Sequence, residues 1–99
     1  MRTMMRVTIP VDAGNKAIRD NSLPKLMQSF VDQFKPEAAY FFASEGKRSA
    51  LFVFDLKEPS QIPAIVEPLF AGFNAAVEFV PVMNADDLRA GLERIPKGL

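Results

Sequence analysis

The strongest constraint on the fold of this chain is an apolar stripe that occurs twice, 39 positions apart. In both copies the apolar residues have the three- and four-residue spacing of one helix face. The first stripe comprises Leu23, Leu26, Met27, Phe30, Val31 and Phe34, and the second comprises Ile62, Ile65, Val66, Leu69, Phe70 and Phe73. Pro24 and Pro63 keep the same offset, as do Tyr40 and Phe79. The repetition predicts two copies of one structural unit, each containing an amphipathic helix.

Four other segments have the alternation and the β-branched or aromatic content of strands. They are residues 4–11, 38–43, 48–56 and 76–83. Pro10 should lie at the end of the first strand, because proline cannot donate a hydrogen bond to a neighbouring strand. Residues 44–47 join the second and third strands as a hairpin, in which Gly46 can adopt a positive φ. A two-residue loop would place Tyr40 opposite Leu51 and a three-residue loop would place it opposite Ala50, and the sequence leaves both registers open.

The helix boundaries follow from capping residues and prolines. We expect the first helix to begin at Ser22 and to end near Lys35, since Pro36 disfavours helical backbone in the residue before it. We expect Ser60 to cap the second helix and Pro68 to kink it. A short terminal helix should follow a cap at Asn84, with two acidic residues in its first turn and apolar residues along one side. These residues are Asp86 and Asp87, and Leu88, Leu92 and Ile95.

The resulting order is strand, helix, strand, strand, helix, strand. It predicts an α+β, ferredoxin-like fold, in which right-handed crossovers put both helices on one face of a four-stranded antiparallel sheet. The short C-terminal helix is an addition to this unit. The 99 residues form one domain, residues 1–99, with an ordinary hydrophobic core.

Composition excludes several classes of chemistry. The chain has no cysteine and no histidine, which removes thiolate nucleophiles, disulfides, haem ligation through histidine and the usual transition-metal ligands. The remaining carboxylates lack the spacing of a metal site, so we expect neither a metal nor a cofactor. No apolar stretch approaches the roughly 18 residues that span a bilayer. We therefore expect a cytoplasmic protein that does not insert into a membrane.

The segment from Arg48 to Asp55 superficially resembles the aromatic signature of an RNA-binding module with the same topology, so RNA binding has to be considered. Ala50 and Asp55 stand where that signature needs aromatic rings that stack on bases. Lysine plus arginine and aspartate plus glutamate both number 12, so the net charge is zero. We expect no nucleic-acid partner.

The strands are apolar on both faces, although two helices can cover only one face of the sheet. In the second strand every residue from Ala38 to Ala43 is apolar, and in the third Leu51 and Val53 alternate with Phe52 and Phe54. The uncovered face has a footprint of roughly 300–400 Å², as large as the largest apolar patch on an ordinary monomer. A second subunit, the terminal helix or a bound apolar ligand could cover it. We expect a homodimer, because closed twofold pairs are the commonest oligomers.

This pattern resembles the dimeric α/β-barrel superfamily, in which two ferredoxin-like subunits pack sheet to sheet. Three local stretches also resemble small bacterial proteins of no assigned activity: residues 36–41, residues 55–63 and residues 83–88. The resemblance spans nearly the whole chain and implies the fold and the dimer. It does not imply an activity, because the superfamily includes cofactor-free monooxygenases, haem enzymes and stress-responsive barrels. Its haem branch and its His-Asp branch need a histidine that this chain lacks.

The best candidate for a functional segment is the polar connection of residues 12–21, which is long for a strand-to-helix loop. Asn15, Lys16 and Arg19 could hold a carboxylate or polarise a carbonyl group across the mouth of the barrel. The alternative is a surface loop with one helical turn, anchored by Ile18, in which these side chains are simply solvated.

Four further residues are candidates. Tyr40, the only tyrosine, could donate a proton or a hydrogen bond as a catalytic residue, or its hydroxyl could simply point into water. Arg48 could help to orient a substrate. Glu78 and Arg6 could pair inside the dimer cavity and bind a ligand there, or Glu78 could be an exposed charge that discourages pairing of an edge strand.

Two functions are compatible with these observations. The first is a homodimeric domain that binds a small apolar molecule or a partner without catalysis. The second is a cofactor-independent enzyme, monooxygenase- or isomerase-like, in which Tyr40, Asn15 and Arg48 orient a small organic substrate.

Overall fold

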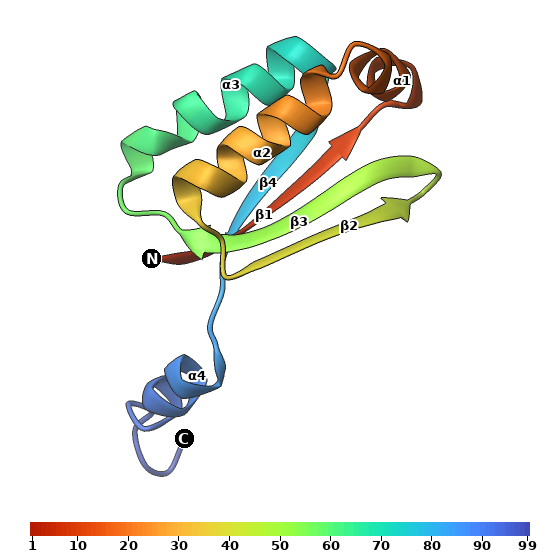
Figure 1. Cartoon of the computed structure of the whole chain (residues 1–99). Helices are drawn as coiled ribbons and strands as arrows, with labels where there is room; N and C mark the ends of the chain where they lie inside the picture. The colour runs from red at the N-terminus through yellow and green to blue at the C-terminus, as the bar shows by residue number, and fades with distance from the viewer.

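The computed structural model describes residues 1–99 and consists of a four-stranded sheet, four α-helices and one 3₁₀ turn. In chain order these are β1 (Arg2–Ile9), α1 (Val11–Arg19), α2 (Ser22–Phe34), β2 (Ala38–Ser44), β3 (Lys47–Asp55), η1 (Pro59–Gln61), α3 (Ile62–Phe73), β4 (Ala76–Pro81) and α4 (Ala85–Leu92). The strands are antiparallel and lie in the order β2-β3-β1-β4. Helices α2 and α3 lie side by side on one face of the sheet (Figure 1). This confirms the ferredoxin-like α+β fold.

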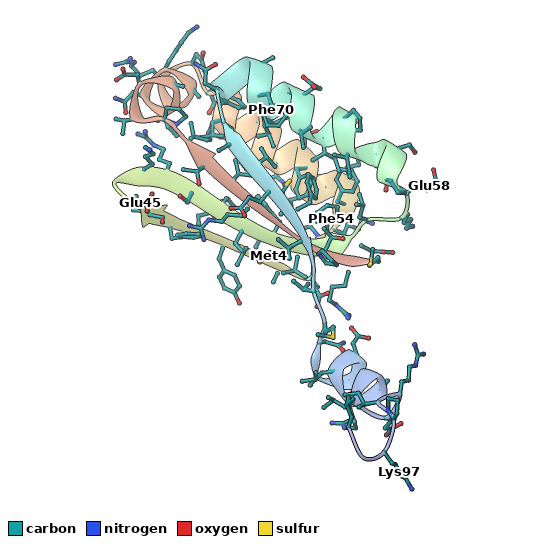
Figure 2. All side chains as sticks on the ribbon, turned by 180° about the vertical axis from the view of Figure 1, so that it is seen from behind. Met4, Glu45, Phe54, Glu58, Phe70 and Lys97 are labelled. Carbon is teal, nitrogen blue, oxygen red and sulfur yellow. The ribbon has the colours of Figure 1, made fainter.

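The hydrophobic core lies between these two helices and the sheet. Strand β1 alternates strictly, with Thr3, Met5, Val7 and Ile9 buried against the helices. The predicted helical stripe of α2 packs on this face, and its Phe30 ring lies 4.8 Å from the ring of Phe52, centroid to centroid. Met4 occupies the opposite, uncovered face, which we call the open face (Figure 2).

Two details of the second helical segment differ from expectation. Ser60 does not cap α3, because residues 59–61 form the turn η1, whose capping box joins Glu58 and Gln61. Phe70 does not belong to the buried stripe: its side chain is 41% exposed, whereas Ile65 and Leu69 are buried. A six-residue stripe is wider than the contact that one helix makes with a sheet, so its outermost member stays in solvent.

The segment from residue 12 to residue 21 is not a loop with one helical turn, as the sequence suggested, because most of it forms the nine-residue helix α1. Pro10 precedes α1 with φ −57°, and Asp12 in the first turn and Arg19 in the last complement the helix dipole. Ala17 is buried against the core cluster. Ile18, expected to anchor the segment, is 48% exposed. The apolar content of α1 is too low to signal a helix, and packing at the end of the sheet stabilises it instead.

The hairpin between β2 and β3 has a two-residue loop. Glu45 and Gly46 have φ values of 54° and 75°, as a type I′ turn requires, and Ser44 pairs with Lys47. Tyr40 therefore lies opposite Leu51, on the open face. The structure decides between the two registers that the sequence left open.

The internal repeat holds for the helices but shifts by one residue in the strands. Three residues connect α2 to β2, whereas two connect α3 to β4. A shift of one residue moves every side chain of a strand to the other face. Tyr40 consequently lies on the open face, while Phe79 pairs with Met5 and faces the helices.

The terminal helix does not cover the open face. Asn84 caps α4 as expected, in a capping box with Asp87, but the helix ends at Leu92 and none of its residues is buried. It lies beyond the end of the sheet, on the side opposite to α2 and α3 (Figure 1). The chain is consequently elongated, with dimensions of 57 × 28 × 19 Å. Of the three possible covers for the open face, the terminal helix of the same chain is excluded.

Candidate functional site

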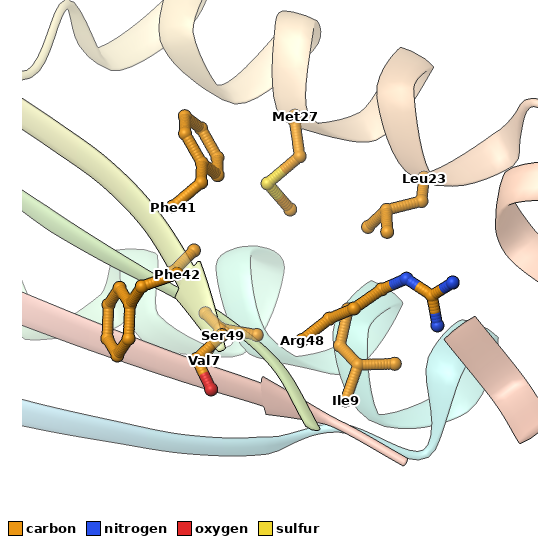
Figure 3. A pocket seen from close by; sticks show the side chains of 9 residues that line it. Val7, Ile9, Leu23, Met27, Phe41, Phe42, Arg48 and Ser49 are labelled. Atoms are coloured by element: carbon orange, nitrogen blue, oxygen red, sulfur yellow. The ribbon is translucent and has the colours of Figure 1, made fainter. Parts of the chain in front are cut away.

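The most enclosed apolar site is a groove between α2 and the edge of the sheet formed by β2 and β3, which we call the edge groove. Its volume is about 190 Å³. It is lined by Val7, Ile9, Leu23, Met27, Phe41, Phe42, Arg48, Ser49 and Ala50. Figure 3 shows Leu23 and Met27 on α2 facing Phe41 on β2.

The groove exists because α2 does not reach over the edge strand. Val7 and Ile9 form its floor and are almost fully buried. Phe41 points to the helix side of the sheet, opposite Ala50, yet it is 62% exposed because no helix covers it. Its ring makes an edge-on contact with Phe52 at 5.7 Å, so the core holds one side of the ring and leaves the other to a ligand.

One end of the edge groove carries a cation. The Arg48 side chain lies at that end (Figure 3). Its guanidinium donates a hydrogen bond from Nη2 to Oδ1 of Asn15, at 3.1 Å, and so connects β3 to α1. Gly14 makes room for it, since a Cβ atom there would lie 2.7 Å from Nη1. Arg48 makes no ion pair with a carboxylate, so its guanidinium is available to bind an anion that enters the groove.

Two of the candidate residues thus come together, Asn15 and Arg48, although 33 positions separate them in the sequence. Lys16 and Arg19 lie in the last turn of α1 and do not line the groove. Lys16 instead lies near Asp20. The pKa of Asp20 is lowered chiefly by the hydrogen bond that it accepts from the hydroxyl of Ser22, at 2.6 Å, with a smaller contribution from the Lys16 charge.

Tyr40 lies on the opposite side of the sheet from this groove. Its side chain is 64% exposed on the open face, and its neighbour across the ladder is Leu51. Within one subunit, Tyr40 and Asn15 do not line a common cavity.

Arg6 and Glu78 are direct neighbours across β1 and β4, as the sequence suggested, but they form no ion pair. Arg6 leans the other way, toward β2, where its Nη2 donates to Oγ of Ser44 at 3.1 Å and its guanidinium lies 5.4 Å from the centre of the Phe42 ring. Glu78 is exposed on an edge strand. Arg6 and Glu78 are therefore both unpaired charges on the open face, and Lys47, opposite Ser44, is a further cation there without an ion pair.

The sequence did not reveal Leu23, Met27 and Phe41 as parts of a site. All three are apolar residues at core-type positions, and nothing local distinguishes a groove wall from core. The one feature of the sequence that could have indicated the groove is the edge strand β2, which is apolar on the helix side as well as on the open face.

The remaining surface offers no comparable site. No three acidic side chains gather as metal ligands would, and no helix has the length and apolar content needed to cross a membrane.

Comparison with models of known protein families gives no match to this chain. A search of curated proteins likewise finds no significant relative.

Proposed function

We propose that this protein binds a small molecule with an apolar, aromatic-sized body and an anionic end, and that it does so without catalysis. The observation that carries the proposal is the edge groove, whose walls and floor are mostly apolar and whose one charged lining residue is Arg48. A mostly apolar cavity with a few placed polar groups is the usual form of a small-ligand site.

The volume of the groove limits the size of the ligand. An apolar protein cavity of about 150 Å³ holds one benzene molecule, and the groove measures about 190 Å³. A benzene ring with one carboxylate therefore fits, with the ring beside Phe41 and the carboxylate at Arg48. Arginine binds carboxylates with two parallel hydrogen bonds, which favours this class of anion.

The test compares two ligands of one shape, benzoate and benzyl alcohol, by amide chemical-shift titration. We expect benzoate to bind more tightly and to shift the amide signals of Ile9, Met27 and Ala50. Replacing Arg48→Gln should weaken benzoate binding about tenfold, the size of one charge-assisted hydrogen bond, and leave benzyl alcohol unchanged. Lys47→Gln is the matched control, because Lys47 is adjacent in β3 but absent from the groove.

Equal affinity for the two ligands, or an equal effect of the two substitutions, would show that Arg48 does not select an anion. Shifts confined to the open face would place the ligand elsewhere and overturn the proposal.

The proposal also includes a homodimer packed through the open face, as in the dimeric α/β-barrel superfamily that the sequence resembles. Its support is a cross-strand row that is apolar on all four strands: Ala38, Val53, Met4 and Val80 are aligned in the sheet register. Sedimentation at high micromolar concentration tests it, and a ligand-free, well-behaved monomer would contradict it. The cytoplasmic location stays a prediction.

The alternative of a cofactor-independent enzyme has less support. It needs Tyr40 and Asn15 at one substrate, and these two residues lie on opposite sides of the sheet in one subunit.

A further inference from the structure

Helix α4 lacks the contacts that normally keep a short helix folded. It has eight residues, all of them exposed. Isolated helices shorter than about 12–15 residues are only marginally stable in water. Its apolar side chains nevertheless project from one side: Leu88, Leu92 and, just after the helix, Ile95 are 46%, 55% and 47% exposed. A stripe of this kind on a helix without a partner indicates a surface that another molecule covers.

One ion pair and one backbone hydrogen bond connect α4 and its linker to the sheet. The Arg2 guanidinium binds Asp87 in the first turn of α4, at 2.7 Å, and also binds Glu37 just before β2. The amide of Val82 donates to the carbonyl oxygen of Arg2, which extends the ladder into the linker that precedes the helix. These contacts keep α4 beyond the end of the sheet, and it does not fold back over its own sheet. We call α4 and the linker before it the arm.

The arm projects on the side of the sheet that has no helices. In Figure 1 the helices α2 and α3 lie above the sheet and α4 lies below it, and Figure 2, from behind, shows the same arrangement with Lys97 at the far end. A body packed against the open face would therefore lie beside α4 as well.

The surface area indicates how large that body is. An 11 kDa monomer ordinarily exposes about 5,600 Å², whereas this chain exposes 6879 Å². The radius of gyration is also large, 16.2 Å, compared with about 13 Å for a compact domain of this length. The exposed area above that of an ordinary monomer is thus larger than the area that each partner buries in a standard stable interface, which is about 800 Å². A protein-sized partner accounts for it, whereas a small ligand is too small.

We infer that the partner is a second copy of this chain and that α4 of each subunit lies against the other subunit, with the Leu88, Leu92 and Ile95 side chains buried in the contact. This inference rests on the homodimer included in the proposed function. A second copy brings an apolar row matching the one that it covers, and twofold symmetry gives both arms a partner at once.

The first experiment asks whether the stripe holds the dimer together. In the full chain, Leu88→Glu with Leu92→Glu should weaken the dimer at least about tenfold in sedimentation equilibrium, because it removes two apolar side chains from the contact and places two carboxylates there without partners. Ala90→Glu with Arg94→Gln is the control, since it changes the net charge equally but leaves the stripe intact. Circular dichroism checks that both variants keep the fold.

The second experiment asks where α4 lies. A photoreactive benzoylphenylalanine at position 92 should cross-link two subunits, whereas the same group at position 90 should give little cross-linked dimer.

The outcomes distinguish the inferred placement of α4 from the existence of the homodimer. A stable dimer in which position 92 cross-links only within its own subunit, or in which the leucine substitutions have no effect, would overturn the placement of the arm and leave the homodimer standing. A monomer at high micromolar concentration would overturn both. Neither result bears on benzoate binding to the edge groove.

Discussion

At the scale of single residues, the chemistry of this protein depends on close contacts that small side chains permit. Gly14 is buried in α1 directly beneath the Arg48 guanidinium. The contact allows Arg48 to reach Asn15 while its charge stays at the end of the edge groove. Without a histidine or a cysteine, this arginine is the groove's only charged group, so its placement decides what the groove can select.

Gly14→Ala should change the affinity for benzoate without lowering the stability of the folded protein. The new Cβ would displace the guanidinium, which can move because it ends a flexible side chain, and the helix would gain up to about 1 kcal/mol from alanine. We therefore expect unchanged or higher stability in urea unfolding, with benzoate affinity lowered several-fold.

Gly72→Ala in α3 is the control, because a Cβ there meets no atom within 4 Å. It should stabilise the protein without changing benzoate binding. If Gly14→Ala also leaves benzoate affinity unchanged, the position of Arg48 does not matter for the ligand.

At the scale of secondary-structure elements, β1 contributes side chains both to the hydrophobic core and to the open face. As the strand at positions 2–9 alternates, one set of side chains builds the core and the other set contributes to the open face. Met5 is 1% exposed beneath the helices. Met4, its neighbour in sequence, lies in the apolar row across all four strands.

Met5→Ala and Met4→Ala should therefore have different effects. Met5→Ala should lower the free energy of unfolding by about 2–5 kcal/mol, because it leaves a cavity in the core. Met4→Ala should lower it by no more than about 1 kcal/mol in dilute protein and should mainly weaken the dimer. Urea unfolding at low concentration and sedimentation at high concentration measure the two effects, and an equal loss of subunit stability would contradict the assignment of faces.

At the scale of the whole molecule, the open face poses an electrostatic problem. A sheet-to-sheet dimer would take Arg6 and Glu78 out of water, and neither has an ion-pair partner in its own chain. A buried charge without a partner is strongly destabilising. The two residues are adjacent in register on β1 and the edge strand β4, so a twofold axis that runs between these two strands would place each opposite the other residue of the second subunit.

Exchange of these charges tests that pairing. Arg6→Glu alone and Glu78→Arg alone should each weaken self-association at least about tenfold, because like charges face each other in the interface. A mixture of the two variants should form heterodimers, since only there do opposite charges meet across the interface. Within each subunit the neighbouring charges remain alike, so recovery on mixing reports contacts between subunits. Native mass spectrometry of the mixture measures it, and the absence of heterodimers would argue against reciprocal pairing.

Much of the fold could be predicted from the sequence because it depends on local periodicity. The helical stripes, the alternation of the strands and the order of elements follow from side-chain spacing, and the capping residue Asn84 acts where it was expected. The boundaries of the four strands and of α2 and α3 were correct to within about two residues, whereas α4 ends at Leu92, three residues before the expected Ile95. Helix α1 was missed because its polar sequence gains stability from tertiary packing, which spacing does not report.

The site was predictable only in part. Asn15 and Arg48 could be named as polar residues beside apolar strands, but their contact depends on how the N-terminal helix meets the hairpin 33 residues later. The groove depends on how far α2 falls short of the edge strand, and the position of α4 beyond the end of the sheet depends on where the chain leaves β4. The sequence by itself determined which residues face each other within an element. Only the tertiary structure decided which surfaces stay uncovered, because that depends on relative positions of elements that no local spacing encodes.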